Sequence, residues 1–161
     1  MSSAEVMERV FPTICELAVV QDEDMRCAAT QALAQMAPTL DPEPCASQLL
    51  AFVSQNLATD HSFRVRKQVA STLGPVSVKL VGTSHVEEGI LPLFIALCHD
   101  DIWGVRKSAV EVLHCVSAGV PLPVRASSLS QLMITEMLHD ESRWVRNTAF
   151  EFLGQFIATL R

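Results

Sequence analysis

Apolar and charged positions recur along this chain every 40 residues. Arginine occupies positions 26, 66, 106 and 146, and leucine occupies positions 33, 73, 113 and 153. Measured from the arginine, the positions at −1, +3, +7 and +10 are apolar in every repeat, which is the spacing of one face of an α-helix. The remaining columns are Met25, Val65, Val105 and Val145; Ala29, Val69, Ala109 and Ala149; and Met36, Val76, Val116 and Phe156. The pattern predicts one amphipathic helix in each of four repeats.

A second apolar pattern precedes each of these helices. Its columns are Leu17, Leu57, Leu97 and Met137, and Ile14, Ser54, Phe94 and Ile134. Breaks rich in proline or glycine, at 38–44, 81–84 and 119–123, separate each pair of helices from the next pair. We therefore expect helices at about 3–20 and 23–37, 43–59 and 62–80, 84–99 and 102–118, and 122–139 and 142–160. Paired in this order, they give a single domain over 1–161 with repeats at about 3–40, 41–80, 81–120 and 121–161.

A repeat of about 40 residues with two helices is typical of a HEAT or armadillo-type solenoid, whose hairpins bury their apolar faces by stacking on one another. Ankyrin and tetratricopeptide repeats are shorter, at about 33 and 34 residues. Pro12 and Pro92 occupy equivalent positions in two of the first helices, where we expect them to bend the helix. The predicted fold is an all-α HEAT-repeat α-solenoid of about four hairpins.

Composition narrows the classes of function. With 161 residues and 49% hydrophobic content, the chain has room for a sizeable core, and its net charge of −6 argues against nucleic-acid binding. Five cysteines without a C-x-x-C pair suggest neither a disulfide framework nor a zinc knuckle. The N-terminus has no secretory pattern, and the longest apolar run, 90–98, is far short of the roughly 20 residues that cross a bilayer. We expect a cytoplasmic or nuclear protein that binds no membrane.

An acidic turn joins the two helices of each hairpin. Asp60, Asp100 and Asp140 share one register in these turns. Stacking of successive repeats brings such turns next to the arginine column, where a carboxylate can accept a bidentate bond from a guanidinium. We therefore predict a structural ladder made by Asp60, Asp100, Asp140, Arg26, Arg66, Arg106 and Arg146, with partner binding by these columns as the alternative. Ser62, Asp101 and Ser142 are the expected helix N-caps.

Two segments carry a family resemblance. Residues 98–107, which contain Asp-Asp-Ile-Trp-Gly-Val-Arg, and residues 142–157, which contain Arg-Trp-Val-Arg, resemble HEAT repeats of regulatory subunits of serine/threonine protein phosphatases of the phosphatase 4 and 2A types. The resemblance implies a non-catalytic regulatory or scaffold subunit that holds a phosphatase catalytic subunit on its intra-repeat turns. The matching positions are Trp103, Trp144, Asp100, Asp101, Asp140 and Arg143. Simple packing of each indole on the adjacent turn is the alternative.

Other classes of function remain as alternatives. A solenoid does not fix its ligand, so an adaptor for nuclear transport or cytoskeletal assembly is a rival interpretation. His61, His99 and His139 recur in the turns, but turns of packed helices lie about 10 Å apart, and zinc ligands must sit about 2 Å from one ion. The chain also lacks the nucleophile-elbow, Walker and Rossmann motifs. A small HEAT-like metal enzyme is the second rival interpretation. The preferred prediction is no enzyme activity, metal or cofactor.

Cysteines and the last helix complete the expectations. Cys15, Cys27, Cys98 and Cys115 fall in apolar helical patterns and are expected to be small core residues. Cys45 lies nearer a helix start, where a more reactive thiol is the alternative to an ordinary one. The last helix carries more aromatic residues than its counterparts, through Phe150, Phe152, Leu153, Phe156 and Ile157. A terminal cap should present a polar outer face, so this surface is expected to be covered by a further repeat or by self-association with another copy.

Overall fold

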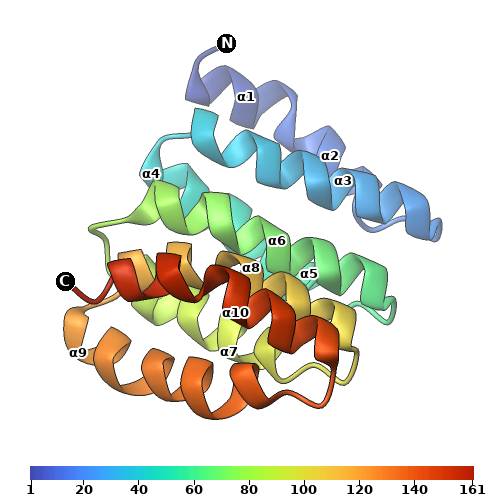
Figure 1. Cartoon of the computed structure of the whole chain (residues 1–161). Coiled ribbons are helices and arrows are strands. Elements are labelled where there is room, and N and C mark those ends of the chain that lie inside the picture. The colour runs from blue at the N-terminus through green and yellow to red at the C-terminus, as the bar shows by residue number, and fades with distance from the viewer.

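The structure, a computed structural model, describes residues 1–161 and consists of helices joined by short turns, without strands. The helices form hairpins that stack in chain order (Figure 1). The second helices of the hairpins lie side by side in one layer, and the first helices form the other layer. The turns inside the hairpins, at 18–22, 57–62, 99–102 and 140–142, line one edge, which we call the turn edge. The predicted all-α solenoid is therefore confirmed.

The bounds of the elements follow the hairpins. The first hairpin contains α1 (Ser3–Arg9), α2 (Phe11–Leu17) and α3 (Glu23–Met36), and η1 (Ala37–Thr39) follows it. The second contains α4 (Pro42–Pro44), the π-helical η2 (Cys45–Leu50), α5 (Ala51–Asn56) and α6 (Phe63–Leu80). The third contains the π-helical η3 (Val86–Ile90), α7 (Leu91–Cys98) and α8 (Trp103–Gly119). The fourth contains α9 (Leu122–Val124), η4 (Arg125–Leu129), η5 (Leu132–Glu136), η6 (Met137–His139) and α10 (Arg143–Ala158).

The first helices are interrupted where continuous helices were expected. Helix α2 begins one residue before Pro12, and α7 begins one residue before Pro92. Proline has no N–H to donate, so the regular i→i−4 ladder is broken there. The second and fourth hairpins also contain π-helical segments, at η2, η4 and η5, but have no proline at the equivalent position. Proline therefore accounts for only some of the interruptions.

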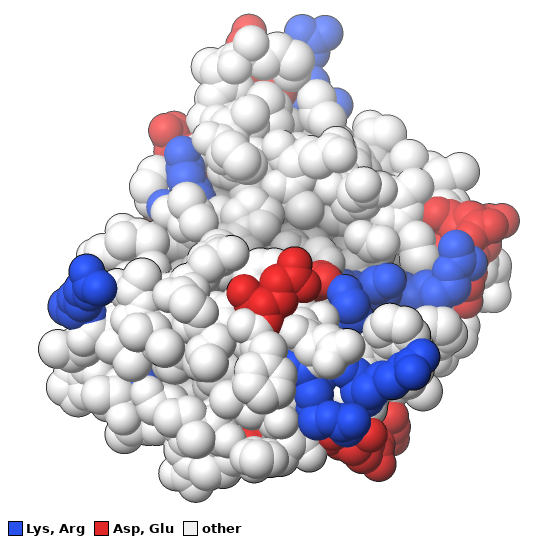
Figure 2. All heavy atoms as spheres, viewed as in Figure 1, with Lys and Arg blue, Asp and Glu red and all other residues white.

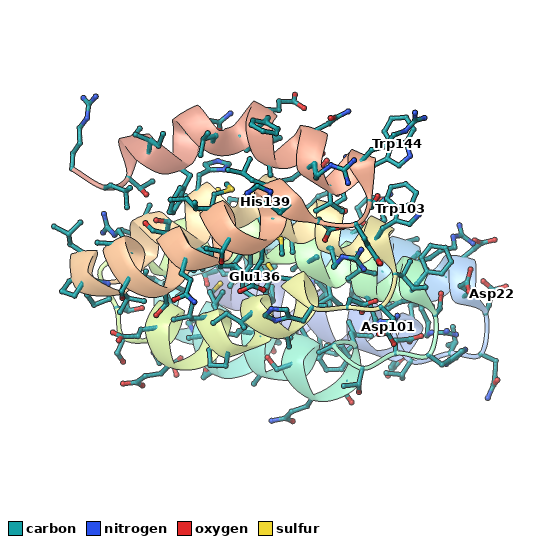
Figure 3. The ribbon with its side chains drawn as sticks, turned by 60° about the horizontal axis from the view of Figure 1, so that its bottom comes forward. Asp22, Asp101, Trp103, Glu136, His139 and Trp144 are labelled. Atoms are coloured by element: carbon teal, nitrogen blue, oxygen red, sulfur yellow. The ribbon has the colours of Figure 1, made fainter.

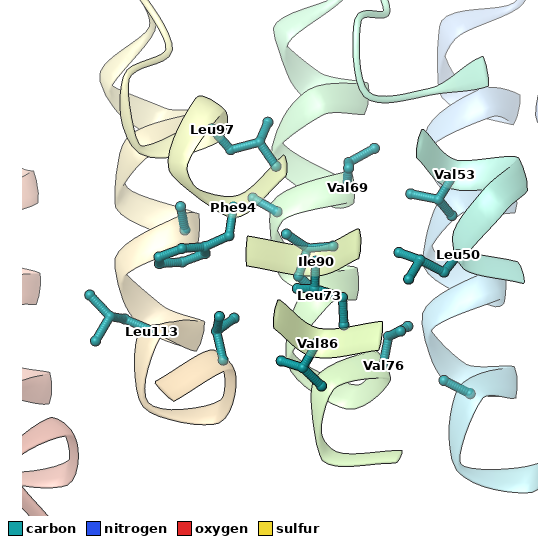
Figure 4. Close-up of a cluster of buried hydrophobic side chains, with 14 of the residues drawn as sticks. Leu50, Val53, Val69, Leu73, Val76, Val86, Ile90, Phe94, Leu97 and Leu113 are labelled. Carbon is teal, nitrogen blue, oxygen red and sulfur yellow. The ribbon is translucent and has the colours of Figure 1, made fainter. Parts of the chain in front are cut away.

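The core runs as one cluster of 37 buried hydrophobic residues through all the hairpins. Figure 4 shows how Leu73 of α6, Ile90 and Phe94 of the third hairpin, and Leu113 of α8 point into the same space. Leu73, Phe94 and Leu113 come from the columns that the 40-residue pattern assigned to the helix faces. Packing of each hairpin on the next one therefore supplies the burial that no single hairpin provides.

Three apolar residues of the predicted columns are exposed, and two more, Ile14 and Leu153, are only half-buried. Met25 and Leu17 are exposed on the first hairpin, which has no helix pair packed on its outer side. Ile134 is 55% exposed, and Met133 is fully buried in its place. Ile134 lies in η5, whose wider i→i+5 turn moves the inward-facing position by one residue. The expectation that these columns face the core was wrong at all three positions.

A glycine permits close packing of α6 against α8. A Cβ atom on Gly74 of α6 would lie 2.9 Å from Cγ1 of Val112 on α8, so glycine lets the two helices approach. Gly82, in the break between the second and third hairpins, has φ of +86°, a conformation that favours glycine. None of the helices is both long enough and apolar enough to span a bilayer.

Candidate functional site

Three arginine–aspartate pairs link neighbouring hairpins along the turn edge. Arg26 Nε lies 2.8 Å from Asp60 Oδ2, and Arg26 Nη2 lies 3.1 Å from Asp60 Oδ1. The corresponding distances are 2.7 and 3.0 Å for Arg66 and Asp100. They are 2.8 and 2.9 Å for Arg106 and Asp140. In each pair the arginine of one hairpin donates two parallel bonds to the aspartate of the next, a bidentate geometry that fixes both groups.

Each pair also stabilises the turns themselves. The Nη1 atom of Arg106 donates to the carbonyl oxygens of Asp100 and Asp101 in its own turn, at 2.8 and 3.2 Å. Oδ1 of Asp140 accepts a bond of 2.8 Å from the N–H of Ser142, at the start of the next second helix. One guanidinium and one carboxylate therefore tie together the turns of two hairpins. The first and second pairs repeat these bonds. Arg26 donates to the carbonyl oxygens of Val20 and Gln21, and Arg66 donates to that of Asp60. Asp60 accepts from the N–H of Ser62, and Asp100 accepts from the N–H of Ile102.

The pairing changes the acidity of the three aspartates. Burial by itself raises the pKa of Asp60, Asp100 and Asp140, because it disfavours the charged form. The hydrogen bonds from the arginine and from a backbone N–H outweigh burial, so the pKa of each carboxyl lies below its usual value. The aspartates are therefore ionised at neutral pH, as the ladder requires.

The ladder contains two departures from its own pattern. Arg146 donates only to the carbonyl oxygens of Asp140 and Glu141 and pairs with no carboxylate. In the first turn, Val20 takes the place of the aspartate, while Asp22 is the N-cap of α3 and accepts from the N–H of Met25 at 2.8 Å.

The expected N-caps differ in what they do. Ser62 accepts from Arg64 N–H, and Ser142 makes no side-chain cap bond. Ile102 rather than Asp101 takes the N-cap position of α8. The prediction of an Asp101 cap was wrong, because α8 begins at Trp103 and the residue before it is Ile102, whose N–H donates to Asp100.

Aromatic side chains lie at the starts of α6, α8 and α10 and form what we call the aromatic groove. The rings of Trp103 and Trp144 stack with their centroids 6.4 Å apart and an angle of 27° between their planes. Figure 3 shows the two rings one above the other, beyond the ends of their helices. The guanidinium carbon of Arg143 lies 4.5 Å from the centre of the Trp144 ring. The groove encloses about 440 Å³ and is lined by Phe63, Lys67, Ile102, Trp103, Gly104, Lys107 and Trp144.

A separate hollow of about 320 Å³, which we call the acidic depression, lies beside the groove. It is lined by Cys98, His99, Asp100, Asp101, Arg106, Glu136, Met137, Asp140 and Glu141. Nε2 of His99 lies 2.7 Å from Oε2 of Glu136. Asp101 is exposed, whereas the carboxylates of Asp100 and Asp140 are held by the ladder arginines.

The structure thus divides the six predicted partner-binding residues between two surfaces. Trp103, Trp144 and Arg143 gather at the aromatic groove, and Asp100, Asp101 and Asp140 border the acidic depression. Lys67 and Lys107, which line the groove, are absent from the set predicted from the sequence. They share one column 40 residues apart, four positions after Phe63 and Trp103, and this spacing of one helical turn is the signal that would have found them.

The histidines and cysteines are distributed over all the hairpins. No group of three histidine, cysteine, aspartate or glutamate side chains is placed to hold a metal ion. His61 is exposed, with Nδ1 3.5 Å from Asp60 Oδ1. Cys45 is fully buried, and burial raises the pKa of its thiol to about 11, so the alternative of a reactive thiol at a helix start is disfavoured. Cys98 is buried as expected, whereas Cys15, Cys27 and Cys115 are only partly buried.

The sequence of this chain is similar to known proteins of one kind. The HEAT repeat family model matches residues 90–120, and together with the stacked hairpins it defines the chain as a HEAT-repeat α-solenoid. Over 156 residues, or 96% of this chain, it is 35% identical to serine/threonine-protein phosphatase 4 regulatory subunit 1 of Homo sapiens. It is 34% identical, over the same length, to the proteins of that name from Mus musculus and Rattus norvegicus. The chain spans 16% of the length of these relatives. The resemblance expected from the sequence is therefore confirmed.

Proposed function

We propose that this chain is a non-catalytic part of a regulatory scaffold that holds a serine/threonine phosphatase catalytic subunit, of the protein phosphatase 4 type, on its turn edge. The observation that carries the proposal is the 35% identity to a phosphatase 4 regulatory subunit over 96% of the chain. The aligned region is nearly the whole chain.

The turn edge supports the proposal through its rigidity. The ladder fixes neighbouring turns by paired charge-assisted bonds, so the residues between them keep their positions when a partner docks. A preorganised surface loses less conformational entropy on binding than a mobile loop does. Such a scaffold acts by raising the local concentration of enzyme and substrate rather than by supplying reactive groups.

The side chains of this protein favour a function in which the partner supplies the catalytic groups. The cysteine nearest to a histidine is Cys115, whose Sγ lies 3.3 Å from Nε2 of His114. Burial raises the pKa of the Cys115 thiol and lowers the pKa of His114. A catalytic thiol needs the opposite shift, toward the thiolate, so this pair is a packing contact. We place the assembly in the cytoplasm or nucleus, in keeping with five free cysteines.

The outer face of α10 supports a second contact, with another helical hairpin. Phe150 is 62% exposed, and Ile157 and Ile134 are also exposed on this side. Arg146 occupies the ladder column without a carboxylate partner. A hairpin with an aspartate in the ladder register would cover the apolar residues and pair with Arg146. A second copy stacked head to tail would offer Val20 instead, so self-association is the less favoured form of this contact.

Co-purification with the recombinant catalytic subunit of protein phosphatase 4 tests the main proposal. We expect a stoichiometric complex with the wild-type chain, and its loss on the double substitution Trp103→Ala and Trp144→Ala while the helical circular dichroism is unchanged. Val78→Ala truncates an apolar residue of α6 that is 62% exposed and lies outside both surfaces of the turn edge, so it is the control. Absence of the phosphatase, with recovery of a nuclear-transport or cytoskeletal protein as a direct partner, would establish the rival adaptor function.

A further inference from the structure

We propose that the aromatic groove binds a segment of a partner protein in which an apolar side chain is flanked by carboxylates. The groove is formed by Phe63, Trp103 and Trp144 together with Lys67 and Lys107. The proposal rests on the proposed function, because it concerns the same turn edge, and it specifies the chemistry of what the partner places there.

The floor of the groove calls for an apolar anchor. Phe63, Trp103 and Trp144 are 45%, 47% and 47% exposed, although the chain buries 37 other hydrophobic residues in its core. The volume of about 440 Å³ falls within the range of about 300 to 1,000 Å³ that is usual for ligand pockets. Stacked indoles are large, rigid apolar surfaces, and such residues contribute strongly to binding when a partner removes them from water.

The charges around the groove favour acidic residues on either side of the apolar side chain of the bound segment. The chain has a net charge of −6, yet the only charged side chains that line the groove are Lys67 and Lys107. Figure 2 shows lysine and arginine side chains gathered at the turn-edge side of the molecule, with acidic groups beside them. Lys107 pairs with Glu111, but Lys67 and Arg143 form no ion pair. A segment that carries carboxylates complements these two cations, and a basic segment is repelled by them.

The neighbouring acidic depression sharpens this selection. Asp101, Glu136 and Glu141 line it, a few residues along the chain from the groove. An acidic segment is repelled from the depression and attracted to the groove, so the two surfaces together fix where the segment lies. The starts of α6 and α8 add to the attraction, because the N-terminal end of a helix carries a partial positive charge.

Selection from a random-peptide library on the immobilised wild-type chain tests this inference. We expect enriched peptides to carry an aromatic or aliphatic residue next to aspartate or glutamate. Trp103 and Trp144 are the only tryptophans in the chain, so a synthetic copy of an enriched peptide should change the intrinsic fluorescence on binding. We expect the affinity to fall about tenfold or more with Trp103→Ala. It should fall roughly threefold with Lys67→Ala and weaken as salt is added.

Two control variants keep the test specific. Val78→Ala and Lys79→Ala change an exposed apolar residue and a lysine outside the groove, and both should bind the peptide as the wild type does. Enriched peptides without carboxylates, enrichment that survives the loss of both tryptophans, or no enrichment would overturn the inference. So would a concentration-dependent dimer that is abolished by Trp103→Ala, because the groove would then hold a second copy.

The outcome is separate from that of the proposed function. Co-purification of the phosphatase catalytic subunit with the wild-type chain decides whether the chain is a phosphatase scaffold, whatever peptides are selected. A phosphatase complex that is insensitive to Lys67→Glu, together with a failed selection, would leave the scaffold in place and refute the acidic segment. Selected acidic peptides without a phosphatase complex would refute the scaffold alone.

Discussion

The ladder and the aromatic groove occupy the same turns, yet they reverse the usual distribution of residues between core and surface. On the first turn of α8, Arg106 is 7% exposed and Trp103 is 47% exposed, although they are only three residues apart. The buried arginine has bonds to Asp140, Glu141 and two backbone carbonyl oxygens. Satisfied hydrogen bonds therefore decide what is buried here, and the indole remains available on the surface.

Removing an arginine from the ladder should have the largest effect on stability. Arg106→Ala leaves the buried carboxylate of Asp140 without its partner, and we expect the free energy of unfolding to fall by about 3 kcal/mol. Urea unfolding followed by circular dichroism measures this. Arg143→Ala removes an exposed guanidinium from the groove side and is the control. Equal losses in the two variants would mean that the ladder is no more stabilising than a surface cation.

Acid should weaken the ladder in a defined range. The pKa values of Asp60, Asp100 and Asp140 are lowered in the folded state, so the unfolded chain takes up protons more readily as the pH falls. This contribution is fully present above the unfolded pKa of about 3.9 and is lost as the pH falls below it, through the lowered folded-state values.

Urea unfolding at a series of pH values between neutrality and strong acid shows whether the free energy of unfolding falls as the pH is lowered. Asp140→Asn should be less stable at neutral pH and show a shallower fall in acid, whereas Asp101→Asn, an exposed neighbour, should follow the wild type. A wild-type stability that rises on acidification through this range would contradict the assigned pairing.

Truncating the groove should affect stability much less than it affects binding. Trp103→Ala removes a ring that is half in water and one stacking partner, so we expect a loss of about 1 kcal/mol. Thermal and urea unfolding measure this loss. A loss as large as that of Arg106→Ala would show that the indoles are mainly packing residues, as in the alternative interpretation of the sequence.

The smallest effect is expected at Lys67. Its side chain is exposed and makes no ion pair, so Lys67→Ala should change the free energy of unfolding by less than about 0.5 kcal/mol. The same unfolding experiment checks this value. A clear destabilisation would give Lys67 a structural role and weaken its assignment to partner recognition.

Much of the fold could be predicted because its information is local and repeated. The columns at Arg106 and Leu113 mark the amphipathic helix α8 on their own, and their recurrence at 40 residues predicts the stack. The irregular first helices were not predictable in the same way. The exchange of Ile134 for Met133 in the core follows from a π-helical turn that no pattern of apolar residues indicates.

For the site, the sequence alone determined which residues take part: the aspartate and arginine columns and the aromatic residues of the turns. The tertiary structure decided their roles. It pairs Arg106 with Asp140 of the next hairpin rather than with Asp100 of its own, and it places Trp103 against Trp144 in a groove with Lys67. The physical reason is that a helical period fixes the face on which a residue lies. Packing between hairpins fixes which neighbour it meets and whether water reaches it.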